Sequence, residues 1–260
     1  MLKPRIIPCL LIKDGGLVKT VNFSHPKYVG DPINVVKILN EKEVDELILL
    51  DISCSAFNKS INFKLIQNIA SECRMPLCYG GGVSTVDDVS RLIEIGVEKV
   101  AINSAIFSDS GLLINASSIV GSQSIVAVID VKYLNGEYLV FKNNGLINTG
   151  FKLKEHIQYV LNQGIGELVI NSIDRDGTLE GFDFKLVEIV KTLINIPLTI
   201  VGGASSHENI KMIFDQFGLI GAGVGSLFVF KGKFKAVLVN YPTGLEKKII
   251  LDFNTFYDGK

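Results

Sequence analysis

Two glycine-rich segments, each directly after a short apolar run, carry residue types that bind anions. The first covers residues 80–82 and the second residues 202–203, and a later apolar run in each half of the chain leads to a hydroxyl residue, Ser104 or Ser226. Glycine lets backbone N–H groups approach an anion closely, and a neighbouring hydroxyl or amide adds a further donor. The pattern suggests two phosphate-binding sites.

The spacing of these segments indicates an internal duplication. Gly81 precedes Gly202 by 121 residues, and Ser104 precedes Ser226 by 122. The glycines could serve only to turn the chain at strand ends. Their repetition with similar polar partners favours anion binding over that alternative.

Two carboxylates end apolar runs, where a charge is costly unless it has a partner or a task. They are Asp51 and Asp130, and we expect both to be functional. Residues 174–178, Asp-Arg-Asp-Gly-Thr, place two acids, a base and a turn glycine after another apolar run. The alternative role for this segment is a solvated surface turn.

Short apolar runs alternate with amphipathic stretches, a pattern typical of parallel strands joined by crossover helices. The predicted strands cover residues 6–11, 47–51, 77–79, 100–102, 125–131, 168–171, 198–201 and 221–225. The predicted helices cover residues 31–41, 62–70, 85–95, 112–118, 152–163, 184–192, 208–214 and 234–241. Asn135-Gly136, between two tyrosines, predicts a hairpin inserted after the fifth strand.

These elements predict an α/β fold, namely a (βα)8 TIM barrel with an internal half-barrel duplication. We expect residues 1–241 to form this single barrel and residues 242–260 to form a C-terminal extension whose role the sequence does not reveal. In such a barrel the carboxyl ends of the strands carry the chemistry.

Composition narrows the class of protein. A chain of 260 residues with 47% hydrophobic and 20% charged residues fits one large globular domain, and its net charge of −1 predicts no nucleic-acid or membrane partner. We find no signal peptide and no membrane-spanning run, so we expect a cytoplasmic protein. The four cysteines lack metal-ligand spacing and are expected to be buried free thiols, and no metal or cofactor is predicted.

A family resemblance extends over about residues 1–232. Its clearest segments are Arg5-Ile-Ile-Pro-Cys-Leu, Leu50-Asp-Ile, Ala101-Ile-Asn-Ser, Val128-Ile-Asp, Ser172-Ile-Asp-Arg-Asp-Gly-Thr and Val201-Gly-Gly-Ala. In these segments the chain resembles HisF, the cyclase subunit of imidazole glycerol phosphate synthase. Residues 172–178, followed by Gly181-Phe-Asp183, resemble HisF more closely than the sister isomerase HisA. The resemblance implies a HisH-like class I glutaminase docked on the N-terminal barrel face, with ammonia crossing the barrel to a bisphosphate substrate on the other face.

The resemblance also implies roles for individual residues. We expect catalytic roles for Asp130, Asp176 and Lys19, the last of which matches the family's flexible-loop lysine, and a substrate-binding role for Asp51. The implied phosphate-binding residues are Gly81, Gly82, Asn103 and Ser104 on one side, and Gly202, Gly203, Gly225 and Ser226 on the other.

Four charged residues stand immediately before apolar strands and should therefore converge at the N-terminal mouth of the barrel. They are Arg5, Glu46, Lys99 and Glu167. Position alone allows a structural ring of ion pairs as readily as a functional gate. The resemblance implies the family's gate for ammonia.

One residue departs from the family pattern at a catalytic position. Where the family has an aspartate that shares acid–base work with the carboxylate at Asp130, this chain has Leu11. A leucine side chain can neither donate nor accept a proton. Removing a catalytic acid or base costs on the order of a hundred-fold to ten-thousand-fold in rate. Asn171 and Val201 replace small hydroxyl residues that are usual in the histidine-pathway enzymes.

Three hypotheses for function follow. In the first, the chain is a HisF-like subunit for acetamidino modification of a bacterial surface-polysaccharide sugar, working with a HisH-like glutaminase, an ATP-dependent sugar amidotransferase and a phosphorylated small-molecule or nucleotide-sugar substrate. In the second, it is a cyclase of histidine biosynthesis in which Asp14 or Asp176 replaces the missing acid. In the third, it is a non-catalytic conduit that activates the glutaminase. The ammonia source must be external, because no cysteine lies in a Gly-x-Cys-x-Gly elbow.

Overall fold

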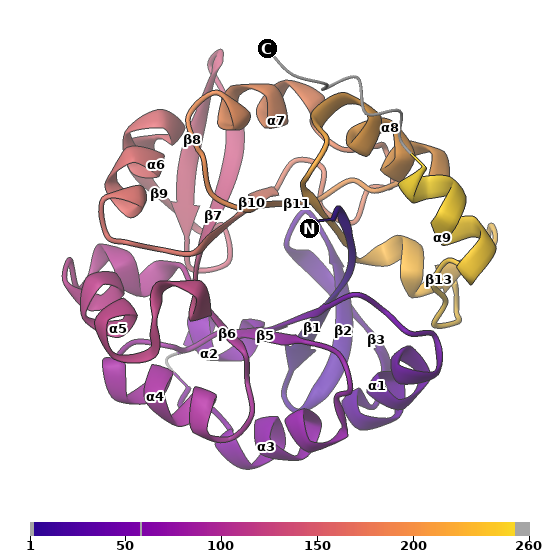
Figure 1. Ribbon diagram of the computed structural model, residues 1–260, viewed down its shortest axis with the longest axis horizontal. Helices are drawn as coiled ribbons and strands as arrows, with labels where there is room; N and C mark the ends of the chain where they lie inside the picture. The colour runs from indigo at the N-terminus through magenta and orange to yellow at the C-terminus, as the bar shows by residue number, and fades with distance from the viewer. Residues whose placement is uncertain (1–2, 58, 253–260) are drawn as a thin grey trace.

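Eight parallel strands close into a barrel in the computed structural model, which describes residues 3–57 and 59–252 (Figure 1). In order around the barrel they are β1 (Arg5–Lys13), β4 (Leu47–Asp51), β5 (Leu77–Gly80), β6 (Lys99–Ile102), β7 (Ile125–Leu134), β10 (Glu167–Ser172), β11 (Leu198–Val201) and β12 (Gly221–Val224). β12 pairs with β1 and so closes the ring. The predicted (βα)8 barrel is confirmed, and each predicted strand is present.

Helices form an outer ring around the strands (Figure 1). They include α1 (Pro32–Glu41), α3 (Phe63–Glu72), α4 (Val86–Glu94), α5 (Leu112–Val120), α6 (Leu153–Leu161), α7 (Phe184–Lys191) and α8 (His207–Phe217). Side chains fix several of the helix starts. Asp31 and Ser206 each accept a hydrogen bond from the backbone three residues later, and Thr85 with Asp88 forms a capping box. These seven helices match the prediction to within a few residues.

The helix predicted over residues 234–241 is wrong. The chain instead forms a short hairpin, β13 (Phe230–Lys231) with β14 (Ala236–Val237), whose turn includes Gly232 and Lys235 at positive φ. The backbone N–H groups of Leu238 and Asn240 then donate to the carbonyls of Val229 and Phe228, so this segment is held extended against the end of the barrel. The helix α9 (Gly244–Leu251) begins later, at a capping box of Thr243 and Glu246.

Antiparallel hairpins lengthen two of the barrel strands. β2 (Gly16–Val21) and β3 (Ser24–Gly30) extend β1, a hairpin that the sequence analysis missed, as it missed the short helix α2 (Ile52–Phe57). The predicted hairpin at Asn135-Gly136 is confirmed: both residues have positive φ, and they join β7 to β8 (Glu137–Lys142). β8 then pairs with β9 (Ile147–Lys152).

The barrel interior is apolar and separate from the larger core beneath the helices. It consists of Ile7, Cys9, Ile48, Cys78, Ala101, Val126, Val128, Val169 and Val201. These residues alternate along their strands with residues that face the helices, as the two-residue period of a strand requires. All four cysteines are free, as predicted, but the expectation that all are buried is wrong for Cys73, which is partly exposed. In the described ranges, no helix has the length and apolar character needed to cross a bilayer.

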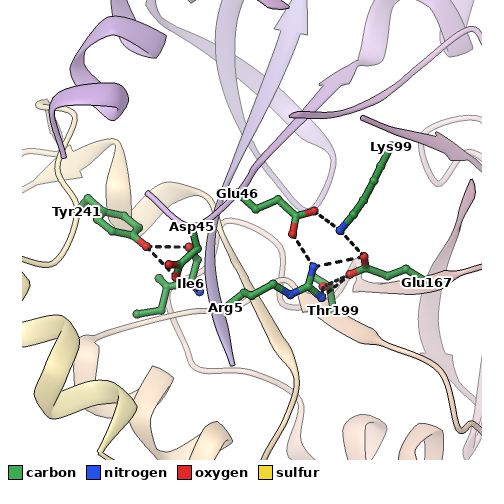
Figure 2. A network of polar contacts seen from close by, with 8 residues as sticks. All are labelled: Arg5, Ile6, Asp45, Glu46, Lys99, Glu167, Thr199 and Tyr241. Atoms are coloured by element: carbon green, nitrogen blue, oxygen red, sulfur yellow. Dashed lines mark hydrogen bonds and ion pairs between the residues drawn. The ribbon is translucent and has the colours of Figure 1, made fainter. Parts of the chain in front are cut away.

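The C-terminal segment is tied to the start of β1 beside the N-terminal mouth (Figure 2). The Tyr241 hydroxyl donates to the carbonyl of Ile6 at 2.9 Å and to Asp45 Oδ2 at 3.3 Å. Asp45 Oδ2 also accepts from the Ile6 N–H at 3.0 Å, and its other oxygen pairs with Lys247 of α9 at 2.6 Å. Residues 241–247 therefore brace the two strands, β1 and β4, that begin beside this network.

The Tyr241 anchor gives a test of the fold. Tyr241→Phe keeps the aromatic ring but removes the hydroxyl that donates to the buried Ile6 carbonyl. The free energy of unfolding should therefore fall by about 1–2 kcal/mol. Chemical denaturation measures this directly, and Tyr28→Phe, on a side chain that is 65% exposed, is the matched control. Equal stability of the two variants would show that the anchor contributes nothing.

Candidate functional site

A cavity of about 670 Å³ opens at the carboxyl ends of the barrel strands. It is lined by every residue predicted to be catalytic or to bind substrate: Lys19, Asp51, Gly81, Gly82, Asn103, Ser104, Asp130, Asp176, Gly202, Gly203, Gly225 and Ser226. The structure thus brings together side chains and loops that are far apart in the sequence, from Lys19 to Ser226. Their individual roles remain predictions.

The two glycine loops have equivalent backbones. Gly81 has φ +114°, and a Cβ built on it would lie 2.2 Å from the carbonyl oxygen of Asp51. Gly202 has φ +97°, and its Cβ would lie 2.6 Å from the carbonyl oxygen of Ser172. In both halves the loop therefore packs directly on the end of the preceding strand, where no larger side chain fits. This similarity extends the duplication from sequence to local geometry.

The second element of each predicted phosphate site is a short 3₁₀ helix. Asn103, at φ −130° and ψ −87°, precedes Ser104–Phe107, and Gly225, at φ −99° and ψ −91°, precedes Ser226–Phe228. Neither helix start receives a side-chain cap, so backbone N–H groups are left for another acceptor. The Ser104 hydroxyl accepts from the backbone N–H of Asn143 at 3.0 Å.

Asp130 is the buried carboxyl at the centre of the site, only 7% exposed. Burial, together with the charge of Asp176, raises the pKa of Asp130 to about 7, although hydrogen bonds from the Asn103 and Asn171 side chains oppose the shift. Asn103 Nδ2 donates to Asp130 Oδ2 at 2.7 Å. The pKa of Asp176 is also raised by burial, against the lowering effect of Lys19 and of Thr20. Asp130 can thus both hold and release a proton near neutral pH.

Lys19 lies in the wall of the cavity beside Gly225. Its side chain is buried, its ammonium donates to the Cys9 carbonyl, and a Cβ on Gly225 would lie 2.6 Å from its Nζ. A lysine in this place puts a positive charge next to the predicted phosphate site. Asp51, at the end of β4, accepts from the Ser53 N–H at 2.9 Å through Oδ1.

Leu11 lines the same cavity, so the site has an apolar side chain where the resembling family has its other catalytic aspartate. Leu11 lies beside Leu50 in the sheet register, and Val128 and Val201 add to the apolar wall. Asp14, considered above as a substitute acid, lies outside this lining and forms an exposed ion pair with Lys59 at 2.7 Å. Asp176, the other substitute considered, does line it.

Sequence reasoning missed the contribution of the loop between β8 and β9. Lys142, Asn143 and Asn144 line the cavity, and Asn144 Nδ2 donates to the carbonyl of Ile52 at 2.8 Å. The sequence contains the turn signal Asn-Asn-Gly, but no local pattern shows that this turn folds back to line the cavity. Within residues 3–57 and 59–252, no group of three or more His, Cys, Asp or Glu side chains is arranged to hold a metal ion.

At the opposite end of the barrel, the four charged residues predicted there form a closed ring of ion pairs (Figure 2). Arg5 contacts Glu46 and Glu167, the latter at 2.7 Å, and Lys99 Nζ contacts the same two carboxylates at 2.7 and 2.8 Å. Both glutamates are buried, and Glu167 also accepts from the Thr199 hydroxyl at 2.7 Å. Burial alone would raise the pKa of Glu167, but Arg5 and Lys99 outweigh it and lower that pKa to about 2.

The pKa of Asp130 gives a test of the site. Because it is raised from 3.8 to about 7, the folded chain keeps this proton over a range in which the unfolded chain has lost it. The contribution of Asp130 to stability therefore falls as the pH rises through this window, with a slope of at most about 1.4 kcal/mol per pH unit. Relative to the parent, Asp130→Asn should gain stability as the pH rises from about 4 to 7. Denaturation at a series of pH values measures this, and a difference that does not vary with pH would contradict it.

Comparison with known proteins places the chain in a family. The model for "Histidine biosynthesis protein" matches residues 5–235. "Putative imidazole glycerol phosphate synthase subunit hisF3" of Vibrio vulnificus is 48% identical over 97% of this chain and 98% of its own length. "Putative imidazole glycerol phosphate synthase subunit HisF" of Leptospira borgpetersenii is 46% identical over 96% of this chain and 99% of its own length. "Imidazole glycerol phosphate synthase subunit HisF" of Streptococcus sanguinis is 35% identical over 88% of this chain and 91% of its own length. The chain therefore belongs to the histidine biosynthesis protein family and is a member of its HisF group.

Proposed function

We propose that this chain is the ammonia-using synthase subunit of a glutamine amidotransferase system, and that the system carries out acetamidino modification of a bacterial surface-polysaccharide sugar. A HisH-like class I glutaminase docks on the N-terminal barrel face and supplies the ammonia. The cavity at the other face receives a phosphorylated substrate. An ATP-dependent sugar amidotransferase is the third partner. We place the system in the cytoplasm.

The observation that carries this proposal is a contrast between the two ends of the barrel. The ring of ion pairs is intact at the N-terminal end, whereas one of the family's two acid–base carboxylates is missing at the other end. The ring of Arg5, Glu46, Lys99 and Glu167 closes the mouth that the ammonia would enter. In the cavity, Leu11 removes one of the two carboxylates on which the family's cyclase chemistry depends, while Asp130 and both glycine loops are present. A chain that needed the full cyclase reaction would be expected to keep both groups.

The apolar interior supports the transfer of ammonia rather than ammonium. Between the ring and the cavity, side chains such as Ile48, Ala101 and Val169 leave a charged ion without partners, and burying an unpaired charge is far more costly than burying a neutral molecule. Ammonia released by the glutaminase would therefore cross this layer in its neutral form.

The names of the relatives are compatible with a separate branch. Identity is 48% to the Vibrio vulnificus relative, whose name carries the word "Putative", whereas it is 35% to the Streptococcus sanguinis subunit, whose name does not. A "Putative" name leaves the role of the more similar relative open, so a role for this chain outside the histidine pathway is compatible with it.

A second candidate, the cyclase of histidine biosynthesis, is favoured by one observation. Asp176 lines the same cavity as Asp130, and burial raises the pKa of its carboxyl. Two carboxyl groups in one cavity could in principle divide acid–base work. A conduit without any catalysis is a third candidate, but two equivalent glycine loops would have no use in it.

A substitution of Lys99 distinguishes between the two possible roles of the ring, an ammonia gate and a purely structural brace. Lys99→Met keeps the aliphatic stem but removes two hydrogen bonds to buried carboxylates, so the free energy of unfolding should fall by about 1–3 kcal/mol with the barrel still folded. In the complex with the glutaminase of the same organism, glutamine-dependent amination should fall more than glutamine hydrolysis. Amination driven by added ammonium salt should persist.

The matched control is Lys152→Met, which breaks an exposed ion pair with Glu137 far from the ring. It should change neither stability by more than about 0.5 kcal/mol nor the ratio of amination to hydrolysis. If Lys99→Met lowers stability and leaves that ratio at the parent value, the ring is structural and the gate is refuted.

Position 11 decides between the two enzymatic candidates. The unmodified chain should not rescue a histidine auxotroph that lacks its cyclase subunit, because one of two proton-transferring groups is missing. Leu11→Asp should restore a trace of growth, and Leu11→Asn, equal in size but without an ionisable group, should not. Full rescue by the unmodified chain would overturn the sugar-modification proposal in favour of the cyclase.

A further inference from the structure

A short exposed hairpin stands where the sequence predicted the last outer helix. It is formed by β13 and β14 at the periphery of the barrel, and every residue from 231 to 238 is exposed (Figure 1). The backbone N–H of Lys235 donates to the carbonyl of Gly232 at 3.0 Å, which closes the turn at the tip. Phe234 lies in this turn and is 91% exposed. The turn therefore presents a large apolar ring to solvent instead of packing it against the barrel.

Four exposed lysines accompany this ring. Lys231, Lys233 and Lys235 belong to the hairpin itself, and Lys27 of β3 joins them. The Lys27 ammonium donates to the Lys235 carbonyl at 3.2 Å and lies 5.1 Å from the centre of the Phe230 ring, so β3 and the hairpin are in contact. Within the described part of the chain, none of the four lysines forms an ion pair with a carboxylate. We call these four lysines and Phe234 the basic hairpin surface.

The sequence around the basic hairpin surface contains no acidic residue. Residues 15–30 and 216–245 hold neither Asp nor Glu, although the whole chain has 27 such residues and a net charge of −1. The overall charge, which predicts no membrane partner, thus conceals a local excess of positive charge. A local excess of one sign attracts a partner of the opposite sign regardless of the net charge.

The composition of this surface favours a lipid partner over a protein partner. Lysine is depleted in the cores of protein–protein interfaces, whereas here four lysines accompany a single ring. The cytoplasmic leaflet of a membrane carries negative charge and attracts clusters of lysine and arginine. Large aromatic side chains are favourable at the boundary between the lipid headgroups and the acyl chains, and a closed turn can place a ring there without exposing unpaired backbone groups to the acyl chains.

We propose that the basic hairpin surface binds the anionic surface of a membrane, with its lysines at the lipid phosphates and Phe234 inserted among the headgroups. The association is peripheral and reversible, because one ring and a few lysines are far weaker than a membrane-spanning helix. Ser226, which lines the cavity, lies four residues before Phe230, so the bound chain holds its cavity close to the membrane. The proposal does not depend on the proposed function.

Sedimentation with lipid vesicles tests the proposal on the full chain alone. The probes are vesicles of phosphatidylcholine with about 30% phosphatidylglycerol, and vesicles of phosphatidylcholine alone. The chain should sediment with the anionic vesicles at about 50 mM salt, be released from them at about 500 mM salt, and leave the neutral vesicles unbound. Equal binding to both kinds of vesicle, or binding to neither, would overturn the proposal.

A triple variant of the hairpin locates the binding. Lys231→Gln, Lys233→Gln and Lys235→Gln together should lower the partition coefficient on anionic vesicles by at least about tenfold, since each lysine near such a surface contributes roughly fivefold. All three side chains are exposed, so the barrel should fold normally, which thermal unfolding checks.

The matched control removes the same charge from other faces of the barrel. It replaces one exposed lysine on each of α3, α6 and α7, namely Lys64→Gln, Lys154→Gln and Lys191→Gln. The control should keep its partition coefficient to within about twofold, because these positions lie away from the bound surface. An equal loss in the two triple variants would show that only net charge matters, and would overturn the proposal.

Fluorescence tests the insertion of the tip separately. The chain contains no tryptophan, so Phe234→Trp introduces a single fluorophore in the turn. Its emission should shift to the blue with anionic vesicles, whereas that of Ile119→Trp, at a 63% exposed position on α5, should not. A Phe234→Trp variant that binds the vesicles without this shift would refute insertion. If the surface instead serves an acidic protein or a second copy of the chain, neither vesicle experiment gives a signal and the proposal is wrong.

Discussion

The ring of two cations and two carboxylates at the N-terminal mouth is the interaction on which the rest of the structure depends. Arg5, Lys99 and Glu167 begin β1, β6 and β10, and Glu46 directly precedes β4, so the ring ties together strands from both halves of the barrel. Buried carboxylates such as Glu46 and Glu167 are tolerated only because each has both a guanidinium and an ammonium partner. The brace of Asp45 and Tyr241 begins one residue from this ring, so the C-terminal helix is attached where the barrel is closed.

The interior above the ring has a layered composition that follows from strand alternation. Inward positions are charged at the mouth, apolar in the middle and polar again at the cavity, where Asp130 and its two asparagines lie. A charged ion is disfavoured in the middle layer, whereas a small neutral molecule is not. The same layering buries Asp130 and so raises its pKa towards neutrality, at the end of the path that we propose for ammonia.

The sequence predicted the barrel well because each of its strands is a buried apolar run and most of its helices have a clear apolar stripe. It failed where elements are exposed or held by distant contacts. β3 is mostly exposed and lacks the alternation that marks a strand. Residues 234–238 are exposed as well, and backbone hydrogen bonds to the segment after β12, rather than an apolar stripe, decide their conformation. The start of α9 did carry a readable signal in Thr243 and Glu246.

At the site, the sequence identified residues but not the direction of their side chains. Strand-end position was enough to bring Asp130, Asn103 and both glycine loops to one cavity. That the Asn103 amide turns to Asp130, leaving its oxygen free, depends on the spacing of adjacent strands and is absent from any local pattern. The contribution of Asn143 and Asn144 likewise depends on how a hairpin folds back over the barrel.

The central claim is that ammonia reaches the cavity through the barrel rather than from solution. Isotope dilution tests it most directly, in a reconstituted complex of this chain with its glutaminase and the sugar-modifying amidotransferase. Glutamine labelled with ¹⁵N in its side-chain amide is supplied together with excess unlabelled ammonium chloride. The account predicts a product that carries mainly ¹⁵N. A product whose label is diluted to the level of the bulk ammonium would contradict it.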